Sequence, residues 1–153
     1  MPSRRLRIKL SFTCVILFSV VVSFPPPTRA QSGGPGTIIL KVTGFHSEKG
    51  QVRIAVFNSS ETWLGEQPVY SSTIKVDSQS VVWNITDVPY GDYGVAAFHD
   101  ENSNGKMDKN LLGIPKERYG FSNNVRATFG PPKWEKGKFA VRNPTTEISI
   151  EVK

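Results

Sequence analysis

Apolar and polar residues alternate along most of the chain from residue 37 onward, and this period of two predicts β-strands. The clearest example is the segment 147–152, in which Ile148, Ile150 and Val152 alternate with hydroxyl and charged residues. One face of such a strand is expected to be buried, and the other face to contact solvent. We expect strands at residues 38–42, 52–56, 73–76, 80–86, 92–100, 138–142 and 147–152.

The number and spacing of these strands predict the fold class. About seven short strands without a long helical repeat are typical of an all-β protein, here an antiparallel β-sandwich of immunoglobulin-like or prealbumin-like architecture. The first two strands are expected to form a hairpin across a turn from Gly44 to Gly50, and Ser60–Leu64 to form a single helical turn. Residues 110–129 show no periodicity, and a loop of this length is usually functional or folded around something.

The first thirty residues have the pattern of a secretory signal peptide. Four basic residues precede an apolar run from Leu10 to Phe24, and Thr28-Arg29-Ala30 places small residues before a cut at Gln31. The apolar run has about fifteen residues, whereas a membrane-spanning helix needs roughly twenty. We therefore expect a cleaved signal peptide at 1–30, a flexible lead at 31–36 and a single β-sandwich domain at 37–153, without stable membrane insertion.

This reading predicts a secreted or periplasmic protein. Arg4 and Arg5 also partly resemble a twin-arginine export signal, so the general secretory route and the twin-arginine route both stay open. Cys14 lies inside the apolar run, so the mature chain is expected to be free of cysteine.

The high net charge belongs mostly to the signal peptide. Removal of its five basic residues reduces 19 Lys and Arg to 14, against 13 Asp and Glu, and lowers the net charge from +6 to +1. A nearly neutral mature chain does not favour nucleic-acid binding or a basic membrane patch.

The segment Asp100–Asp108 has the spacing of a calcium-binding loop. The side chains of Asp100, Asn102 and Asn104 supply oxygen at every second residue, Gly105 permits a sharp turn, and the Lys106 carbonyl and Asp108 complete the candidate ligand set. The glutamate usual at the twelfth loop position is absent, because Leu111 stands there, so weak Ca²⁺ binding is expected.

The calcium hypothesis has two further candidate ligands and one alternative. Glu101 or Glu117 could supply an additional oxygen ligand, although the sequence does not place either near the ion. The alternative is a metal-free loop in which the Asp and Asn side chains accept hydrogen bonds from their own backbone amides.

Catalysis is not expected. His99 is adjacent to Asp100, but neighbouring residues of a strand point to opposite faces, so the two side chains should not form a dyad. The mature chain has no cysteine nucleophile and no Gly-x-Ser-x-Gly segment, and a zinc site would lack nitrogen and sulfur ligands. A hydrolase that uses His99 with a carboxylate stays an alternative that requires a cleft containing both.

Aromatic residues in loops or at strand ends provide a candidate binding surface. They would either stack on a sugar or seal the end of the sandwich. Trp83 alternates with Val81 and Ile85 and is expected in the core. The aromatic candidates are Trp63, Trp134, Tyr90, Tyr119 and Phe121.

Three segments, 91–108, 112–117 and 119–124, together resemble the bacterial domain of unknown function 2141 family. The resemblance implies a small exported β-sandwich protein and implies no activity. It departs from the family pattern at Arg118, where a glycine commonly precedes the Tyr-Gly-Phe segment. The chain is also similar, in architecture alone, to prealbumin-like repeat domains of bacterial surface proteins.

The sequence thus predicts an exported, non-catalytic binding or structural module of the cell envelope with a calcium-ordered loop. Its partner is expected to be an envelope protein or a glycan, and the alternative is a carbohydrate-recognition module that uses the loop aromatics. The candidate partner surface consists of Tyr119, Phe121, Asn123 and Asn124.

Overall fold

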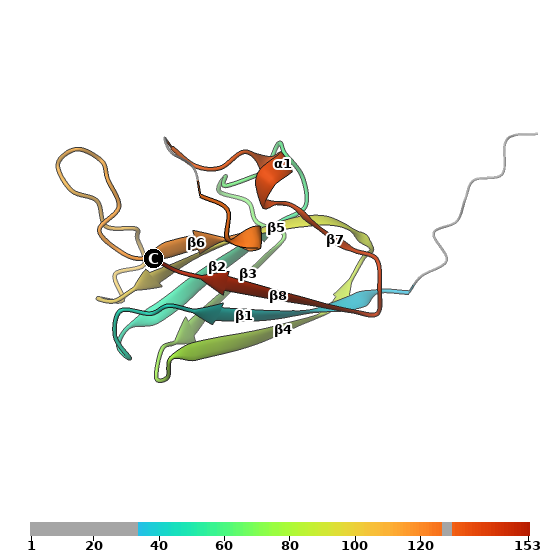
Figure 1. Cartoon of the computed structure of the whole chain (residues 1–153), viewed down its shortest axis with the longest axis horizontal. Helices are drawn as coiled ribbons and strands as arrows, with labels where there is room; N and C mark the ends of the chain where they lie inside the picture. The colour runs from blue at the N-terminus through green and yellow to red at the C-terminus, as the bar shows by residue number, and fades with distance from the viewer. Residues whose placement is uncertain (1–33, 127–129) are drawn as a thin grey trace, which may run out of the picture. The chain divides into compact units, whose positions relative to one another are not determined.

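The computed structural model describes residues 34–126 and 130–153 and confirms the all-β fold class (Figure 1). The predicted signal peptide lies outside the described residues. The elements are β1 (Gly36–Thr43), β2 (Gln51–Phe57), β3 (Tyr70–Lys75), β4 (Ser80–Val88), β5 (Gly91–Asp100), β6 (Tyr119–Phe121), the 3₁₀ turn η1 (Ser122–Asn124), α1 (Trp134–Gly137), β7 (Phe139–Val141) and β8 (Thr145–Glu151).

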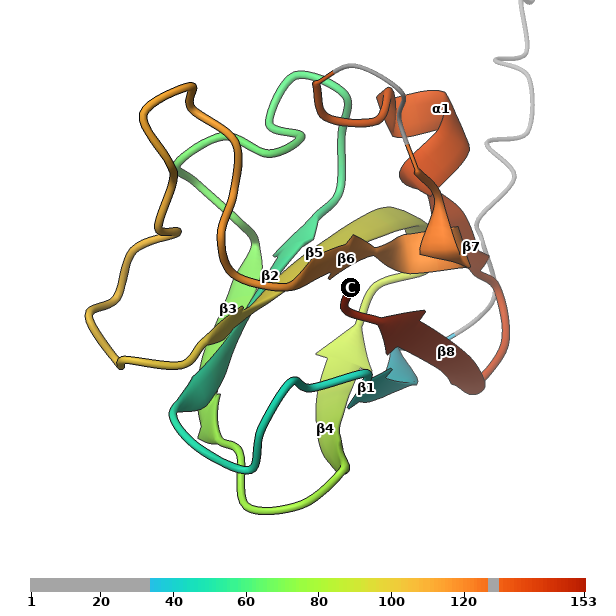
Figure 2. The same cartoon turned by 60° about the vertical axis from the view of Figure 1, so that its left-hand side comes forward.

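The strands form two sheets that face each other across the core (Figure 2). One sheet has the order β4-β1-β8, and the other has the order β3-β2-β5-β6, with β7 pairing to the first part of β5. All pairs are antiparallel except β1 with β8, which run parallel. No helix of the described chain is long and apolar enough to cross a bilayer.

The core lies between the inner faces of the two sheets. Ile38, Leu40 and Val42 of β1 are fully buried and belong to the same cluster as the buried Val52 and Val56 of β2. The alternation in the sequence therefore identified the inner faces of β1 and β2 correctly. Trp83 is partly buried against this cluster, as expected.

The predicted hairpin between the first two strands is wrong. β1 pairs with β4 and β8, whereas β2 pairs with β3 and β5 in the opposite sheet. The segment between them crosses from one sheet to the other, and Gly44 and Gly50 have φ angles of 86° and 70° there. Alternation predicts which face of a strand is buried but does not distinguish two paired strands from two strands that face each other across a core.

Three short elements were not predicted. β6, η1 and α1 occur where the sequence shows no usable periodicity, because each has only three or four residues. The Ser60–Leu64 segment forms turns rather than a helix, and the Gly65 N–H donates to the Thr62 carbonyl at 2.9 Å.

β6 also joins the two sheets at one edge of the sandwich. The Lys153 N–H donates to the Tyr119 carbonyl at 3.1 Å, and the Tyr119 N–H donates to the Lys153 carbonyl at 3.3 Å. The chain after β8 therefore closes the edge at which the long loop between β5 and β6 returns to the sandwich.

Candidate functional site

The outer face of β5 carries the candidate site. Its inner residues, Tyr93, Val95, Ala97 and His99, are buried in the sandwich. The outward residues Gly94, Ala96, Phe98 and Asp100 are also buried or half-buried. A strand that is apolar on both faces needs cover on both faces, and loops supply that cover on the outside.

Asp100 anchors the acidic loop to the end of β5. Its carboxylate is fully buried and accepts hydrogen bonds from the Asn104 N–H at 3.0 Å, the Gly105 N–H at 2.9 Å and the Gln51 side-chain amide at 2.8 Å. Charged acceptors make stronger hydrogen bonds than neutral ones. The loop is therefore fixed at its first residue from both β5 and β2.

The pKa of the Asp100 carboxyl is lower than its ordinary value. Burial is the largest single influence and raises the pKa, but the hydrogen bonds from Gln51, Gly105 and Asn104 and the positive charge of Arg53 together outweigh it. Asp100 is therefore held as a carboxylate in the folded protein at neutral pH.

The other predicted ligands lie in the same loop and bind one another. The Asn102 amide donates to one Asp108 oxygen at 2.8 Å, and the Asn104 amide donates to the other at 3.1 Å. The amide oxygens of Asn102 and Asn104 accept the backbone N–H groups of Asn104 and Lys106 at 3.1 and 2.8 Å. The five predicted residues are thus brought together, and this hydrogen-bond pattern corresponds to the metal-free alternative.

Glu117, which follows the acidic loop in the chain, binds two of the backbone amides of that loop. Its buried carboxylate accepts the Glu101 N–H at 3.2 Å and the Asp108 N–H at 3.0 Å, so it braces the loop through the backbone. Leu111 is fully exposed, away from this network. Within residues 34–126 and 130–153, no group of three or more His, Cys, Asp or Glu side chains is arranged to hold a metal ion.

His99 faces the interior and does not meet the Asp100 carboxylate. Its ring is fully buried, with Nε2 at 2.7 Å from the Lys49 carbonyl oxygen and its edge against Phe45 at a centroid distance of 5.1 Å. Glu101 lies beside Nδ1 at 3.8 Å, too far for a hydrogen bond. The cleft containing both His99 and a carboxylate that the hydrolase alternative requires is not found among the described residues.

A groove of about 950 Å³ runs over the outer face of the five-stranded sheet, and we name it the outer groove. Its floor consists of β2 and β5, and its walls come from the loop before β6 and the loop after β2, both of which lie on the side of β2 and β5 away from β1 and β4 (Figure 2). The residues that line it include Arg53, Ala55, Phe57, Leu64, Ala96, Phe98, Met107, Lys109, Ile114, Pro115, Tyr119, Phe121 and Pro131.

An aromatic cluster covers one end of this outer face. Trp63 packs against Phe57, Trp134 and Phe121 at centroid distances of 5.5, 5.5 and 6.1 Å, and its indole N–H donates to the Pro132 carbonyl at 2.8 Å. The ring planes meet at 83°, 66° and 55°. These loop tryptophans are therefore packed over the sheet rather than arranged as a flat platform.

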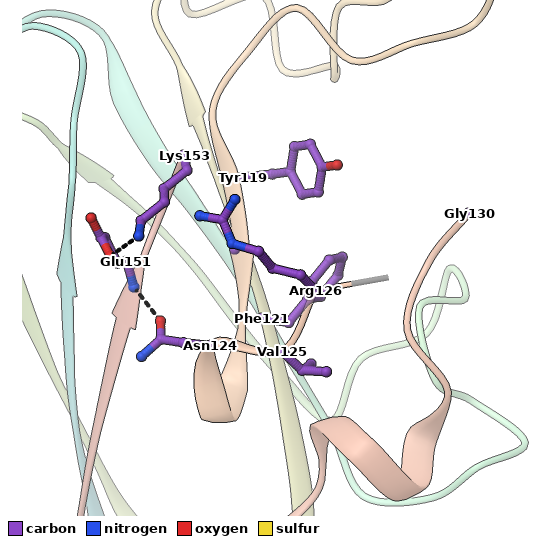
Figure 3. A pocket seen from close by; sticks show the side chains of 9 residues that line it. Tyr119, Phe121, Asn124, Val125, Arg126, Gly130, Glu151 and Lys153 are labelled. Carbon is purple, nitrogen blue, oxygen red and sulfur yellow. Dashed lines mark hydrogen bonds and ion pairs between the residues drawn. The ribbon is translucent and has the colours of Figure 1, made fainter. Parts of the chain in front are cut away.

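Three of the four residues of the predicted partner surface, Tyr119, Phe121 and Asn124, line one small cleft, and Asn123 lies next to it in the chain. This cleft of about 160 Å³ lies beside the end of the chain (Figure 3), and the rings of Tyr119 and Phe121 are 5.8 Å apart at 71°. Asn124 accepts the Glu151 N–H at 2.8 Å, and the Asn123 amide donates to the Lys138 carbonyl at 2.8 Å. The two asparagines thus hold η1 against β8 and the α1–β7 segment. Non-coplanar rings do not favour a sugar platform.

The most exposed apolar residues lie on a hairpin that the sequence did not predict as a structured unit; we name residues 108–116 the tip hairpin. The Lys116 N–H donates to the Asp108 carbonyl at 2.8 Å, and the Asn110 N–H donates to the Ile114 carbonyl at 2.9 Å. The Asn110 side chain accepts the Leu112 and Ile114 N–H groups at 2.9 and 3.0 Å. Leu111 and Leu112, at relative exposures of 106% and 83%, project from this internally bonded turn.

Comparison with known proteins gives one family. The family model described as "Uncharacterized protein conserved in bacteria (DUF2141)" matches residues 40–149, which contain the acidic loop, the tip hairpin and all residues that line the outer groove. No curated protein and no solved structure matches the chain.

Proposed function

We propose that this chain, which belongs to the DUF2141 family of uncharacterized proteins conserved in bacteria, is an exported, non-catalytic binding module of the cell envelope. The pattern of the first thirty residues supports export to the periplasm or beyond. The tip hairpin supports a binding role and is the observation that carries the proposal.

The tip hairpin presents two leucines to solvent on a fixed backbone. Contiguous exposed apolar side chains mark interaction sites in soluble proteins. Because the hairpin is ordered by its own hydrogen bonds, a partner would not have to order it, and this lowers the entropic cost of association. Leucine side chains have no hydrogen-bonding group for sugar hydroxyls, so a protein partner is favoured over a glycan.

Calcium is the second part of the proposal. The oxygen spacing from Asp100 to Asp108 supports it, but an ion would have to replace the amide hydrogen bonds that Asp108 now accepts. Rotation of the Asn102 and Asn104 side-chain amides would turn their oxygens toward the Asp108 carboxylate. Oxygen atoms that face one another repel, so this arrangement is favourable only with a cation bound between them. The exchange of existing hydrogen bonds for metal contacts is consistent with weak affinity, on the order of 10⁻⁴ to 10⁻³ M.

Thermal unfolding of residues 31–153 in Ca²⁺, Mg²⁺ and chelator tests the calcium part. With about 10 mM Ca²⁺ we expect a gain of about 1–3 kcal/mol in the free energy of unfolding, from the affinity range above. The Asp108→Ala variant should lose this gain, because Asp108 is the carboxylate that faces both amides. An equal gain in that variant, or none in the wild type, would show that the loop is held by its hydrogen bonds alone.

Site-specific photo-crosslinking in the intact envelope tests the binding part. A photoreactive residue at position 112 should yield a discrete crosslinked product, whereas the same residue at the exposed Lys41 of β1 should not. Identical products from both positions would mean that the tip hairpin is not a specific contact surface.

A further inference from the structure

The floor of the outer groove is unusual for the outside of a sandwich. Ala55 of β2 and Ala96 of β5 are direct partners in register, and both point outward. Phe98 follows two residues later on the same face. A sheet face that contacts solvent normally carries polar side chains, so small and aromatic residues here form an apolar floor with room above it.

The loops cover the two ends of this floor but not its middle. At one end the ring atoms of Trp63 and Trp134 lie directly over Gly94. At the other end the wall consists of Met107 and of two residues of the tip hairpin, Ile114 and Pro115. The open space of about 950 Å³ between them lies within the 300–1,000 Å³ that is typical of small-molecule sites.

The charged residues of the groove have one sign. Arg53 and Lys109 line it, and no carboxylate does. Arg118 and Arg142 donate to the Gly44 carbonyl and to Asp92. In contrast, no described residue accepts a hydrogen bond from the Arg53 guanidinium or forms an ion pair with Lys109.

The Asp100 carboxylate does not accept a hydrogen bond from the Arg53 guanidinium. It lies near enough to Arg53 for the two charges to interact, but it is fully buried and already accepts three hydrogen bonds. The donors of Arg53 thus stay available to a ligand, and Lys109 adds a second positive charge.

Arg53 lies at one end of the groove, in the same row as Phe98 and Tyr119, and the Trp63–Trp134 pair lies at the other end, which we name the aromatic end. Arg53 pairs with Phe98, and Phe57 pairs with Gly94 four residues further along each strand. At about 3.4 Å per residue, these two rows are about 14 Å apart. Ala55 and Ala96 lie between them, so a chain that extends from Arg53 crosses small side chains before it reaches the aromatic end.

We propose that the outer groove binds a linear amphipathic anion, a long-chain carboxylate, with its head at Arg53 and Lys109 and its chain over Ala55 and Ala96 toward the aromatic end. Guanidinium groups bind carboxylates through two parallel hydrogen bonds, and the small floor accepts a chain without displacing side chains. This site goes beyond the proposed function: it shares the wall formed by the tip hairpin but does not use Leu111 or Leu112.

The probe is dodecanoate, titrated below its micelle concentration against residues 31–153 and followed by calorimetry and by tryptophan fluorescence. We expect saturable one-to-one binding with a blue shift of the emission, because Trp63 borders the aromatic end. Dodecanol, the neutral analogue of equal length, should bind at least fivefold more weakly. If dodecanoate binding does not saturate, or if the two compounds bind equally, the proposal is wrong. This test needs only the wild-type protein.

Variants then locate the site. Ala96→Phe should fill the floor and weaken dodecanoate binding at least tenfold; Ala55→Leu serves the same purpose if the first variant does not fold. The Arg53→Gln, Lys109→Gln double variant should lose the preference for dodecanoate over dodecanol. Lys41→Gln on the other sheet should change binding less than twofold, and unchanged binding in the groove variants would contradict the assignment.

A Leu111→Ser, Leu112→Ser double variant separates this inference from the proposed function. It should bind dodecanoate as the wild type does and, with the photoreactive residue placed at the exposed Lys116 of the same hairpin in both proteins, lose the crosslinked envelope partner. If it loses dodecanoate as well, the ligand lies on the tip hairpin rather than in the outer groove, and the groove assignment is wrong.

Discussion

The side-chain amide of Gln51 on β2 donates a hydrogen bond of 2.8 Å to the buried carboxylate of Asp100, the last residue of β5. The same carboxylate accepts two backbone N–H groups from the acidic loop. The start of the loop is therefore attached to two neighbouring strands, and Arg53, two residues after Gln51, is held close to the same point.

The lowered pKa of Asp100 predicts a specific loss of stability in acid. Because its folded-state pKa lies below the ordinary value of 3.8, its ionisation stabilises the folded protein above that pH. This contribution is lost as the pH falls through the lowered folded-state pKa. Asp100→Asn should therefore flatten the acid limb of the stability curve, measured by urea unfolding between pH 6 and pH 2.5, whereas Asn at the exposed Asp77 should not.

Glu117→Gln should loosen the acidic loop without unfolding the sandwich. A glutamine has one acceptor oxygen where the glutamate uses two, so either the Glu101 or the Asp108 N–H loses its partner, at a cost of about 1–3 kcal/mol. Hydrogen exchange measured by NMR should accelerate at these two amides. Unchanged protection at both would contradict the bracing role of Glu117, and acceleration throughout β2 and β5 would indicate global destabilisation instead.

Gly94→Ala should displace the aromatic cluster. A Cβ at this position would lie 2.5 Å from a ring carbon of Trp63 and 2.8 Å from one of Trp134, far inside van der Waals contact. Overpacking of this kind costs about 1–3 kcal/mol, and the displaced indoles should shift tryptophan emission to longer wavelength. Gly34→Ala is the matched control, since nothing lies within 4 Å of its Cβ; equal spectra for both variants would refute the packing argument.

Tyr93→Phe should destabilise the turn between β4 and β5. The Tyr93 hydroxyl donates to the Pro89 carbonyl at 2.8 Å, and the ring is buried in the core. Loss of this hydrogen bond should lower the free energy of unfolding by about 1 kcal/mol, measured by denaturant titration at neutral pH. Tyr119→Phe, which removes a hydroxyl from a more exposed ring, should leave stability within about 0.5 kcal/mol.

The sequence predicted what depends on local periodicity and failed where distant segments decide the outcome. Alternation located seven strands and the buried faces of the first two, but it assigned β1 and β2 to one hairpin because paired strands and facing strands have the same pattern. β6 was missed because three residues carry no period, and its place is fixed by β5 and by Lys153.

The candidate site shows the same division. The spacing of Asp100, Asn102 and Asn104 located the loop, and the hydrogen bonds from its backbone amides to Asp and Asn side chains are of the kind that the sequence predicts for these residue types. The outer groove was not predictable, because its floor and walls come from separate segments. Its one local signal was the apolar pattern on both faces of β5, which indicates that something covers the outside of that strand.

The parallel pairing of β1 with β8 has a consequence for the timing of folding. The first strand of the sandwich stays without one of its two neighbours until β8 has been synthesised, so the three-stranded sheet forms only after all the segments between these two strands have emerged from the ribosome. Contacts so distant along the chain also slow folding.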